Sequence, residues 1–197
     1  MAFSERSRHS TGPDNEKGKM QGQIVLVGMM GVGKTAVGAA LARRLGAGFV
    51  DTDAEIERAA AMPISEIFAR DGEAFFRARE TQILSRLLDG PRGVIATGGG
   101  AWIQEANRAL IRRAGLAVWL DSDLETLWHR VRQRPTRPLL QTADPKGTLA
   151  ALIAARSPVY AQADLRVESR RGSDVDATAA RLYDAIEAAR PGFMGVS

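Results

Sequence analysis

The stretch IVLVGMMGVGKTAVG, residues 24–38, decides the fold class. An apolar run passes into a glycine-rich turn, and the turn ends on a lysine and a threonine where a helical pattern begins. Further short apolar runs follow at 49–51, 94–97, 117–120 and 165–168, and amphipathic helical patterns separate them. Short apolar strands that alternate with helices are typical of a parallel sheet covered on both faces. The sequence therefore predicts an α/β fold in three layers, with a five-stranded parallel sheet flanked by helices.

Capping motifs and apolar periodicity indicate where the helices begin. Thr52 with Glu55, and Ser122 with Glu125, have the spacing of a capping box. Trp128 falls on the apolar face of its helix, so we expect it in the core and not on a base-stacking surface. The expected helices lie near 34–45, 54–60, 72–88, 104–113, 123–133, 147–156 and 175–189.

Composition limits the chemistry that the chain can perform. Its 197 residues are 45% hydrophobic, which suits one domain with a buried core. The chain has no cysteine and only two histidines, which excludes disulfides and thiolate metal sites and disfavours a zinc centre. A formal net charge of +4 favours anionic ligands, and small anions are enough to explain it. Catalysis must therefore depend on Asp, Glu, Arg, Lys and hydroxyl groups.

The ends of the chain differ in character from its middle. Residues 1–20 are polar and aperiodic and lack the apolar segment of a signal peptide, so we expect a flexible N-terminal tail. We expect a single domain at 21–192 and a short C-terminal tail at 193–197. No run of eighteen apolar residues occurs, so the sequence predicts a cytoplasmic protein without a membrane span.

The glycines of the opening stretch match the P-loop pattern G-x-x-x-x-G-K-[ST], from Gly28 to Thr35, in the required context between a strand and a helix. Backbone N–H groups of such a turn point at phosphate oxygens, and the helix adds its positive end. The lysine would neutralise phosphate charge and the threonine hydroxyl would ligate Mg²⁺. A tight turn with an exposed lysine is the alternative. The expected contacts to ATP are Gly31, Val32, Gly33, Lys34, Thr35 and Ala36.

Two carboxylates, Asp51 and Asp53, follow the second expected strand. Ligands of open α/β sheets lie at the carboxyl ends of the strands, which places both residues beside the P-loop. One carboxylate could hold a Mg²⁺-bound water, and the other could accept a hydroxyl proton. Helix capping by Asp51 or Thr52 is the simpler alternative, and it is compatible with the first.

The segment DGEAFFRARE, residues 71–80, reads as the start of a helix capped by Asp71. By itself this segment indicates only an exposed pair between Glu73 and Arg77, one turn apart. Three consecutive glycines, 98–100, follow the third strand, and their entropic cost suggests a backbone that a ligand approaches closely. A tight turn is the alternative there.

The segment HRVRQRPTRPLLQTADP, residues 129–145, is rich in arginine and interrupted by prolines. A solvated basic loop is the usual meaning of such a run. A nucleic-acid surface is less favoured, because interleaved exposed aromatic residues are missing. In a phosphoryl-transfer protein a mobile loop with arginines can close over the reacting phosphate. We therefore expect a lid at about 130–145.

Taken together, the motifs GMMGVGKT, FVDTD, DGEAFFR, TGGG, RPLL and RSPVY, in this order and spacing, resemble the shikimate kinase family over about residues 23–190. The resemblance implies a P-loop kinase fold, usually monomeric. It also implies transfer of the ATP γ-phosphate to the 3-hydroxyl of shikimate, in the pathway to chorismate and the aromatic amino acids. The implied partners are shikimate, ATP and Mg²⁺, with neither nucleic acid nor membrane.

The resemblance also assigns roles to individual residues. Asp53 matches the aspartate that orients or deprotonates the attacking hydroxyl, with Asp51 near the magnesium shell. Arg77 and Arg156 match the arginines that hold the substrate carboxylate, which agrees with the planar fork of a guanidinium. The residues that match the substrate-contacting triglycine are Gly98, Gly99 and Gly100.

Three further arginines are carried over to the nucleotide side. Arg137 matches a lid arginine that reaches the phosphates and serves catalysis. Arg130 matches the arginine that borders the adenine pocket. Arg171 lies near a second adenine-side position, where the loop aligns loosely.

Two alternatives remain open at this point. A gluconate kinase uses the same scaffold on another hydroxy acid, and the D-T-D, G-G-G and RPLL motifs argue against it. A regulatory nucleotide-binding module that has lost turnover should lack Asp53, Arg77 or Arg137, and all three are present.

Overall fold

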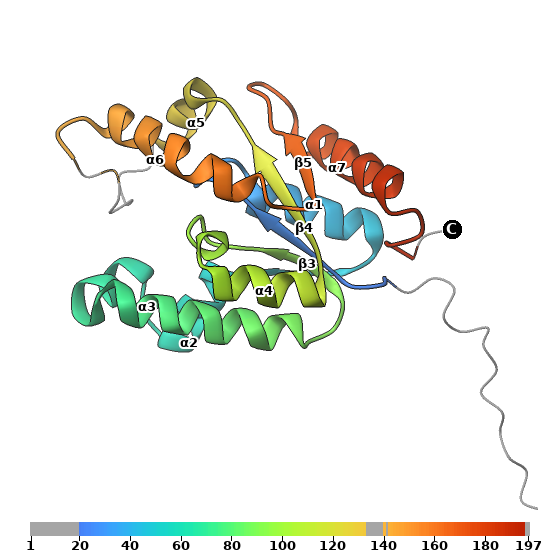
Figure 1. Cartoon of the computed structure of the whole chain (residues 1–197), viewed down its shortest axis with the longest axis horizontal. Coiled ribbons are helices and arrows are strands. Elements are labelled where there is room, and N and C mark those ends of the chain that lie inside the picture. Colours follow the sequence, from blue (N-terminus) through green and yellow to red (C-terminus); the bar gives the residue numbers. More distant parts are fainter. Residues whose placement is uncertain (1–19, 133–139, 141, 196–197) are drawn as a thin grey trace, which may run out of the picture.

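The computed structural model describes residues 20–132, 140 and 142–195. Its centre is a parallel sheet in the order β2-β3-β1-β4-β5 (Figure 1). The strands are β1 (Gln23–Val27), β2 (Gly48–Asp51), β3 (Gly93–Ala96), β4 (Gly115–Asp121) and β5 (Leu165–Glu168). The expected five-stranded parallel sheet is confirmed.

Helices cover the sheet on both sides. They are α1 (Lys34–Leu45), α2 (Thr52–Ala60), α3 (Ile64–Leu88), α4 (Glu105–Ala114), α5 (Leu124–Val131), α6 (Pro145–Tyr160) and α7 (Val175–Ala189), with a 3₁₀ turn η2 at Ala101–Ile103. Helices α1 and α7 pack together on one side, whereas α3 and α4 pack together on the other (Figure 1). Every residue of β1 and β3 is buried, which explains why these strands are apolar without alternation.

The main hydrophobic core lies between the sheet and these helices, and it includes Trp102, Trp119 and Tyr160. Trp128 is partly buried against this core, as the sequence predicts. A smaller core joins α2 to α3 and consists of Ile56, Ile67, Phe76 and Ile83. The packed domain also extends past the expected bounds of 21–192. Met20, Phe193 and Met194 are buried in the main core, and the Gln21 amide donates to the Phe193 carbonyl at 2.8 Å.

Both predicted capping boxes are wrong by one residue. Asp51 caps α2 by accepting from the amide of Asp53 at 2.9 Å, because the hydroxyl of Thr52 accepts from the amide of Gly98 instead. Asp123 caps α5 by accepting from the amide of Thr126 at 2.8 Å, since the hydroxyl of Ser122 donates to the carbonyl of Ser169. In each case the aspartate carboxylate accepts the hydrogen bond from a free amide in the first turn of the helix, and the neighbouring Thr or Ser hydroxyl forms a hydrogen bond with a distant segment.

Helix α3 joins two helical segments at a kink, and the sequence predicts only the second of them, near 72–88. It starts at Ile64, after Pro63, and continues through a kink at Gly72, whose φ of 81° and ψ of 172° lie outside the helical region. Asp71 therefore lies inside α3 and not at its first turn, and its carboxylate accepts from the guanidinium of Arg70 at 2.7 Å. A helical segment thus begins after Gly72, where the sequence predicts one, but among the described residues no backbone amide donates to the Asp71 carboxylate, so the predicted cap is wrong.

Candidate active site

The turn between β1 and α1 forms a phosphate-sized cradle at the carboxyl end of the sheet. Gly31 and Gly33 have φ values of 80° and 103°, which only glycine adopts readily, and they let the chain curl ahead of α1. No side chain caps the N-terminus of α1, so its first amides and its positive dipole end face the cavity. A cavity of about 630 Å³ lies in front of this turn and is lined by the predicted residues Gly31, Val32, Gly33, Lys34, Thr35 and Ala36.

Lys34 is positioned by the turn that it serves. Its ammonium donates to the carbonyls of Gly28 at 2.7 Å and Met29 at 2.9 Å, and its side chain is buried. These bonds hold the cationic end of Lys34 within the cradle. The alternative of a tight turn with an exposed lysine is excluded by this burial.

Asp51 and Thr35 form the metal-competent edge of the cavity. The hydroxyl of Thr35 donates to the carboxylate of Asp51 at 2.6 Å, so two oxygen ligands lie together beside the phosphate cradle. Mg²⁺ prefers oxygen ligands, and in kinases it keeps waters and substrate phosphates as its remaining ligands. Among the described residues no cluster of three or more His, Asp or Glu residues could hold a metal. The Thr35 hydroxyl and the Asp51 carboxylate fit a Mg²⁺ ion that takes its other ligands from water and phosphate.

Asp53 lies deeper in the same cavity, in an environment that disfavours its charge. Its Oδ1 is buried and has no hydrogen-bond partner. Burial, with the nearby charge of Asp51, raises the pKa of Asp53 to about 6, while the charge of Lys34 opposes the rise. A buried carboxylate oxygen without a partner can accept a hydrogen bond from a ligand hydroxyl or take its proton.

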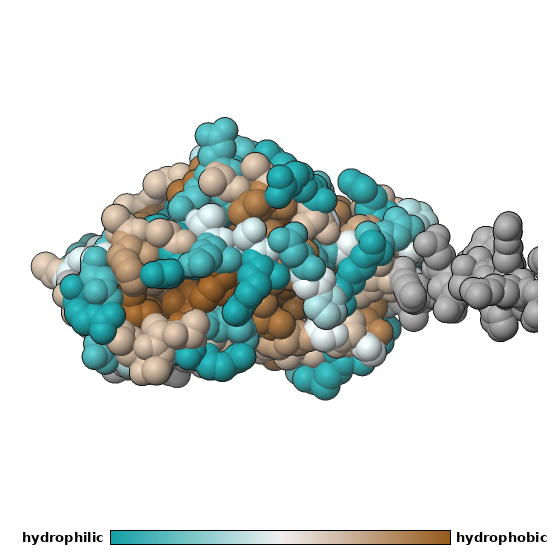
Figure 2. Space-filling model, turned by 90° about the horizontal axis from the view of Figure 1, so that it is seen from below, coloured by the Kyte–Doolittle hydropathy of each residue, from teal (hydrophilic) through white to brown (hydrophobic). Residues whose placement is uncertain are grey.

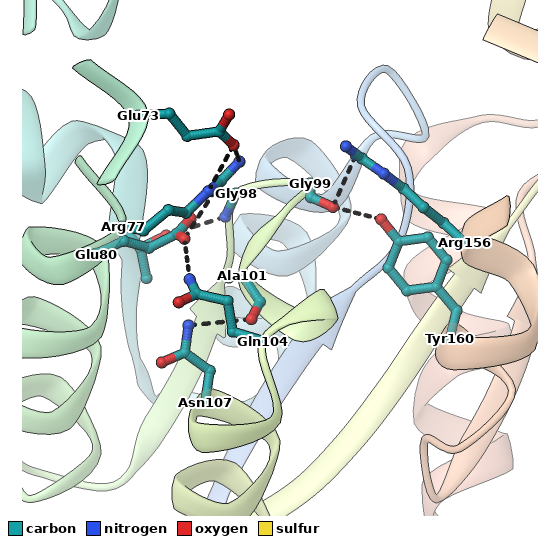
Figure 3. Close-up of polar contacts among 11 residues, drawn as sticks. Glu73, Arg77, Glu80, Gly98, Gly99, Ala101, Gln104, Asn107, Arg156 and Tyr160 are labelled. Atoms are coloured by element: carbon teal, nitrogen blue, oxygen red, sulfur yellow. Dashed lines mark hydrogen bonds and ion pairs between the residues drawn. The ribbon is translucent and has the colours of Figure 1, made fainter. Parts of the chain in front are cut away.

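The triglycine turn lies between the two predicted carboxylate-binding arginines, Arg77 and Arg156 (Figure 3), and Asp53 approaches it at Gly98. A side chain at Gly98 would meet Asp53 Oδ1 at 2.6 Å, and one at Gly100 would meet the Arg77 guanidinium at 2.5 Å. On the other side of the turn, Arg156 donates to the Gly99 carbonyl at 3.5 Å. The glycines are therefore required by close side-chain approach, and they bring Asp53, Arg77 and Arg156 to one short segment.

Arg77 is held by two carboxylates of different character. Glu80, which is 1% exposed, accepts from Arg77 Nη1 at 2.9 Å, and the 62%-exposed Glu73 accepts from Arg77 Nη2 at 3.1 Å. The exposed pair contributes about 0 to 1 kcal/mol, so a ligand carboxylate can displace Glu73 at little cost. Burial raises the pKa of Glu80, and Arg77 opposes that rise.

Sequence reasoning missed the residues that support the turn. Glu80 also accepts from Gln104 at 3.0 Å, and the Tyr160 hydroxyl donates to the Gly99 carbonyl (Figure 3). Burial raises the pKa of Tyr160 to about 12, so this phenol stays a donor. The spacing of Glu80 three residues after Arg77 was a usable signal. Tyr160 and Gln104 come from other elements and have no local signal.

The three arginines predicted on the nucleotide side differ in where the structure places them. Arg130 donates to the carbonyl of Val32 at 2.9 Å and to the hydroxyl of Ser169 at 3.0 Å, which places it on the cavity wall with both residues. Arg171 is exposed, and it does not line the cavity. Arg137 and most of the expected lid lie outside the described residues, so the prediction for Arg137 stays a prediction.

A stability measurement can test the environment of Asp53. In the absence of nucleotide and Mg²⁺, Asp53→Asn should unfold with a free energy higher by on the order of 1 to 3 kcal/mol at pH 8, because the folded-state pKa is raised and ionisation opposes folding. The gain should shrink as the pH falls from about 6 toward the unfolded-state value of 3.8, since Asp53 is then protonated in both states. Urea unfolding of Asp53→Asn and the parent protein at pH 8 and at pH 4.5 measures this gain. An equal gain at pH 8 and pH 4.5 would contradict a buried, charge-disfavoured carboxyl.

The parallel sheet, the glycine cradle and the adjacent carboxylates define a P-loop nucleotide-binding protein, with a carboxylate and two arginines gathered beside the cradle at the triglycine turn. The family model for shikimate kinase matches residues 30–187 of this chain. The chain belongs to the shikimate kinase family.

Individual relatives agree with this assignment. A shikimate kinase of Cereibacter sphaeroides is 58% identical over 173 residues, which cover 88% of this chain and 86% of the relative. The structure of an Acinetobacter baumannii shikimate kinase in complex with shikimate has a TM-score of 0.82 and 38% identity, over 86% of this chain and 95% of that chain. A gluconokinase structure from Sinorhizobium meliloti has a TM-score of 0.52 and 18% identity over 87% of this chain and 99% of its own, and shares only the fold. In the described residues no helix has the length and apolarity that a bilayer span requires.

Proposed function

We propose that this enzyme transfers the γ-phosphate of ATP to the 3-hydroxyl of shikimate, giving shikimate 3-phosphate and ADP. The observation that carries the proposal is the unpartnered, buried oxygen of Asp53 between the phosphate cradle and the triglycine turn. A hydroxyl placed there would lie beside a proton acceptor and face the cradle that holds the phosphates.

The residues divide the work between two substrates. The P-loop amides and Lys34 hold the phosphates, and Arg77 and Arg156 hold the shikimate carboxylate from opposite sides of the triglycine turn. Thr35 and Asp51 would hold Mg²⁺, which on binding neutralises charge on the phosphates. Asp53 orients the acceptor hydroxyl and takes its proton as the hydroxyl oxygen bonds the γ-phosphorus and the bond to ADP breaks.

Acceptor specificity tests the proposal. Both substrate arginines and Asp53 approach one short turn, so we expect fast ADP formation with shikimate and at least about a hundredfold slower formation with gluconate or with water as the acceptor. The measurement is ADP release with each acceptor at equal ATP and Mg²⁺, and with Mg²⁺ removed. ADP formation that is equally fast with gluconate or without an acceptor would contradict the assignment.

Three further expectations complete the proposal. We propose that Mg²⁺ accompanies ATP, that the enzyme acts as a monomer and that it is cytoplasmic. Asp53, Arg77 and Arg156 already meet at the triglycine turn within a single chain, so the described part of the site needs no residue from a second copy, which supports the monomer. Light scattering at working concentration tests the oligomeric state.

A further inference from the structure

A second cavity of about 520 Å³ lies between α2 and α3, away from the nucleotide cradle. Its floor is formed by Ile56, Ile67 and Ile83, three of the four members of the smaller core. Figure 2, which views the molecule from below, shows a hydrophobic surface on this side of the protein, interrupted by hydrophilic side chains. Its volume lies in the range of pockets that bind small molecules.

One face of α3 forms the wall of this cavity. Phe75, Arg79, Gln82 and Arg86 are spaced four, three and four residues apart, so they project from the same side of the helix. Arg77, which reaches the triglycine turn, is two residues from Arg79 and therefore projects from the opposite side. The cavity is thus separated from the substrate subsite by the thickness of α3.

The arginines of the wall differ in how far their charge is compensated. Arg70 is paired with Asp71 at 2.7 Å, and Arg86 with Glu55 at 3.2 Å. Arg79 donates to the neutral side chain of Gln82 at 2.7 Å and lies 5.0 Å from the centre of the Phe75 ring. Within the described part of the chain, the guanidinium of Arg79 forms no ion pair with a carboxylate.

Phe75 gives the cavity an exposed apolar surface beside the charge of Arg79. It is 39% exposed, one of only two large hydrophobic side chains exposed in the described residues. An exposed ring beside an apolar floor favours an apolar ligand body, and the uncompensated Arg79 guanidinium favours a planar anion at the rim. We propose that the cavity between α2 and α3 binds a small apolar carboxylate, with the apolar body on the isoleucine floor and the carboxylate on Arg79.

The test uses 3-phenylpropionate as the probe and the full chain labelled with ¹⁵N, in the presence of saturating shikimate to occupy Arg77 and Arg156. We expect saturable amide shifts at Ala59, Ala60 and Gln82, with a dissociation constant on the order of 1 to 10 mM for a ligand of this size. The neutral amide, 3-phenylpropanamide, should bind at least about tenfold more weakly, because it lacks the charge that Arg79 recognises.

Two variants localise the binding. Arg79→Gln should weaken binding of 3-phenylpropionate by about tenfold or more. Ala59→Trp, which fills the cavity from α2, should abolish the amide shifts. Arg43→Gln is the matched control, because Arg43 is an exposed arginine on α1 that pairs with Asp176, and it should change nothing. Thermal unfolding confirms that each variant is folded.

Three results would overturn the proposal. Shifts confined to the triglycine turn and the P-loop would mean that the probe only enters the substrate site. Binding that survives Arg79→Gln and Ala59→Trp unchanged would place the probe elsewhere. Shifts at the cavity that depend on protein concentration without any probe would make this face a contact between two copies. Failure of shikimate to bind would appear separately, as missing shifts at Gly98 to Gly100 before the probe is added.

Discussion

Asp53→Asn should lower kcat with shikimate by about 10² or more, the size usually seen when a positioned acid or base is removed. An asparagine keeps the shape of the side chain and can still hydrogen-bond a hydroxyl. It cannot take a proton, however, or present a negative charge to the hydroxyl. Ground-state binding should therefore survive better than turnover, so the shikimate KM should change much less than kcat.

Steady-state kinetics with purified variants measure this split. Asp176→Asn is the control, because Asp176 is a 74%-exposed carboxylate on α7 that pairs with Arg43 and does not itself line the cavity. The control should keep the kcat of the parent enzyme. A rise in shikimate KM with an unchanged kcat for Asp53→Asn would reduce Asp53 to a binding group. The greater stability expected for the same variant at pH 8 separates this loss from misfolding, since a less active enzyme would then be a more stable one.

The part of the site that the sequence predicted is the part built from short segments. The P-loop needs only a strand, a turn and a helix start, so its pattern between Gly28 and Thr35 carries the whole geometry. Asp51 and Asp53 follow from the rule that ligands bind at the carboxyl ends of parallel strands. Residue types alone did not assign Arg77, which the segment 71–80 presents as half of an exposed ion pair. The resemblance to shikimate kinases supplied its role.

The features that escaped prediction depend on contacts between distant segments. Tyr160 reaches the Gly99 carbonyl from the end of α6, across 61 residues of sequence. Thr52 bonds the Gly98 amide across 46 residues, which removes it from its expected capping role. The helical segment before Gly72 was missed, because the glycine that follows Asp71 indicated only the start of a helix. Such choices are settled by tertiary packing, which a local pattern does not contain.

Arg77→Ala should raise the shikimate KM by roughly ten- to hundredfold and leave the KM for ATP within a few fold. A charge-assisted contact to a carboxylate contributes about 1.5 to 3 kcal/mol, and Arg77 lies on the triglycine side of the site, away from the phosphate cradle. Arg77→Lys should give a smaller rise, because a lysine keeps the charge but loses the planar fork. The lysine variant also leaves a cation for the buried Glu80, whose isolation could destabilise the alanine variant.

Replacement of Glu73 distinguishes the substrate role of Arg77 from the simple ion pair on α3. If Arg77 holds the shikimate carboxylate, Glu73 competes for the same guanidinium, so Glu73→Gln should lower the shikimate KM slightly or leave it unchanged. If Arg77 has only a structural role, Glu73→Gln should reduce stability by a few tenths of a kcal/mol, and Arg77→Ala should reduce it more, because the buried Glu80 then loses its cation. Neither variant should then alter the shikimate KM. Arg43→Ala is the control for loss of a positive charge, since its guanidinium is 69% exposed on α1. An unchanged shikimate KM in Arg77→Ala would return the residue to its structural role and would leave Arg156 as the carboxylate-binding arginine of the site.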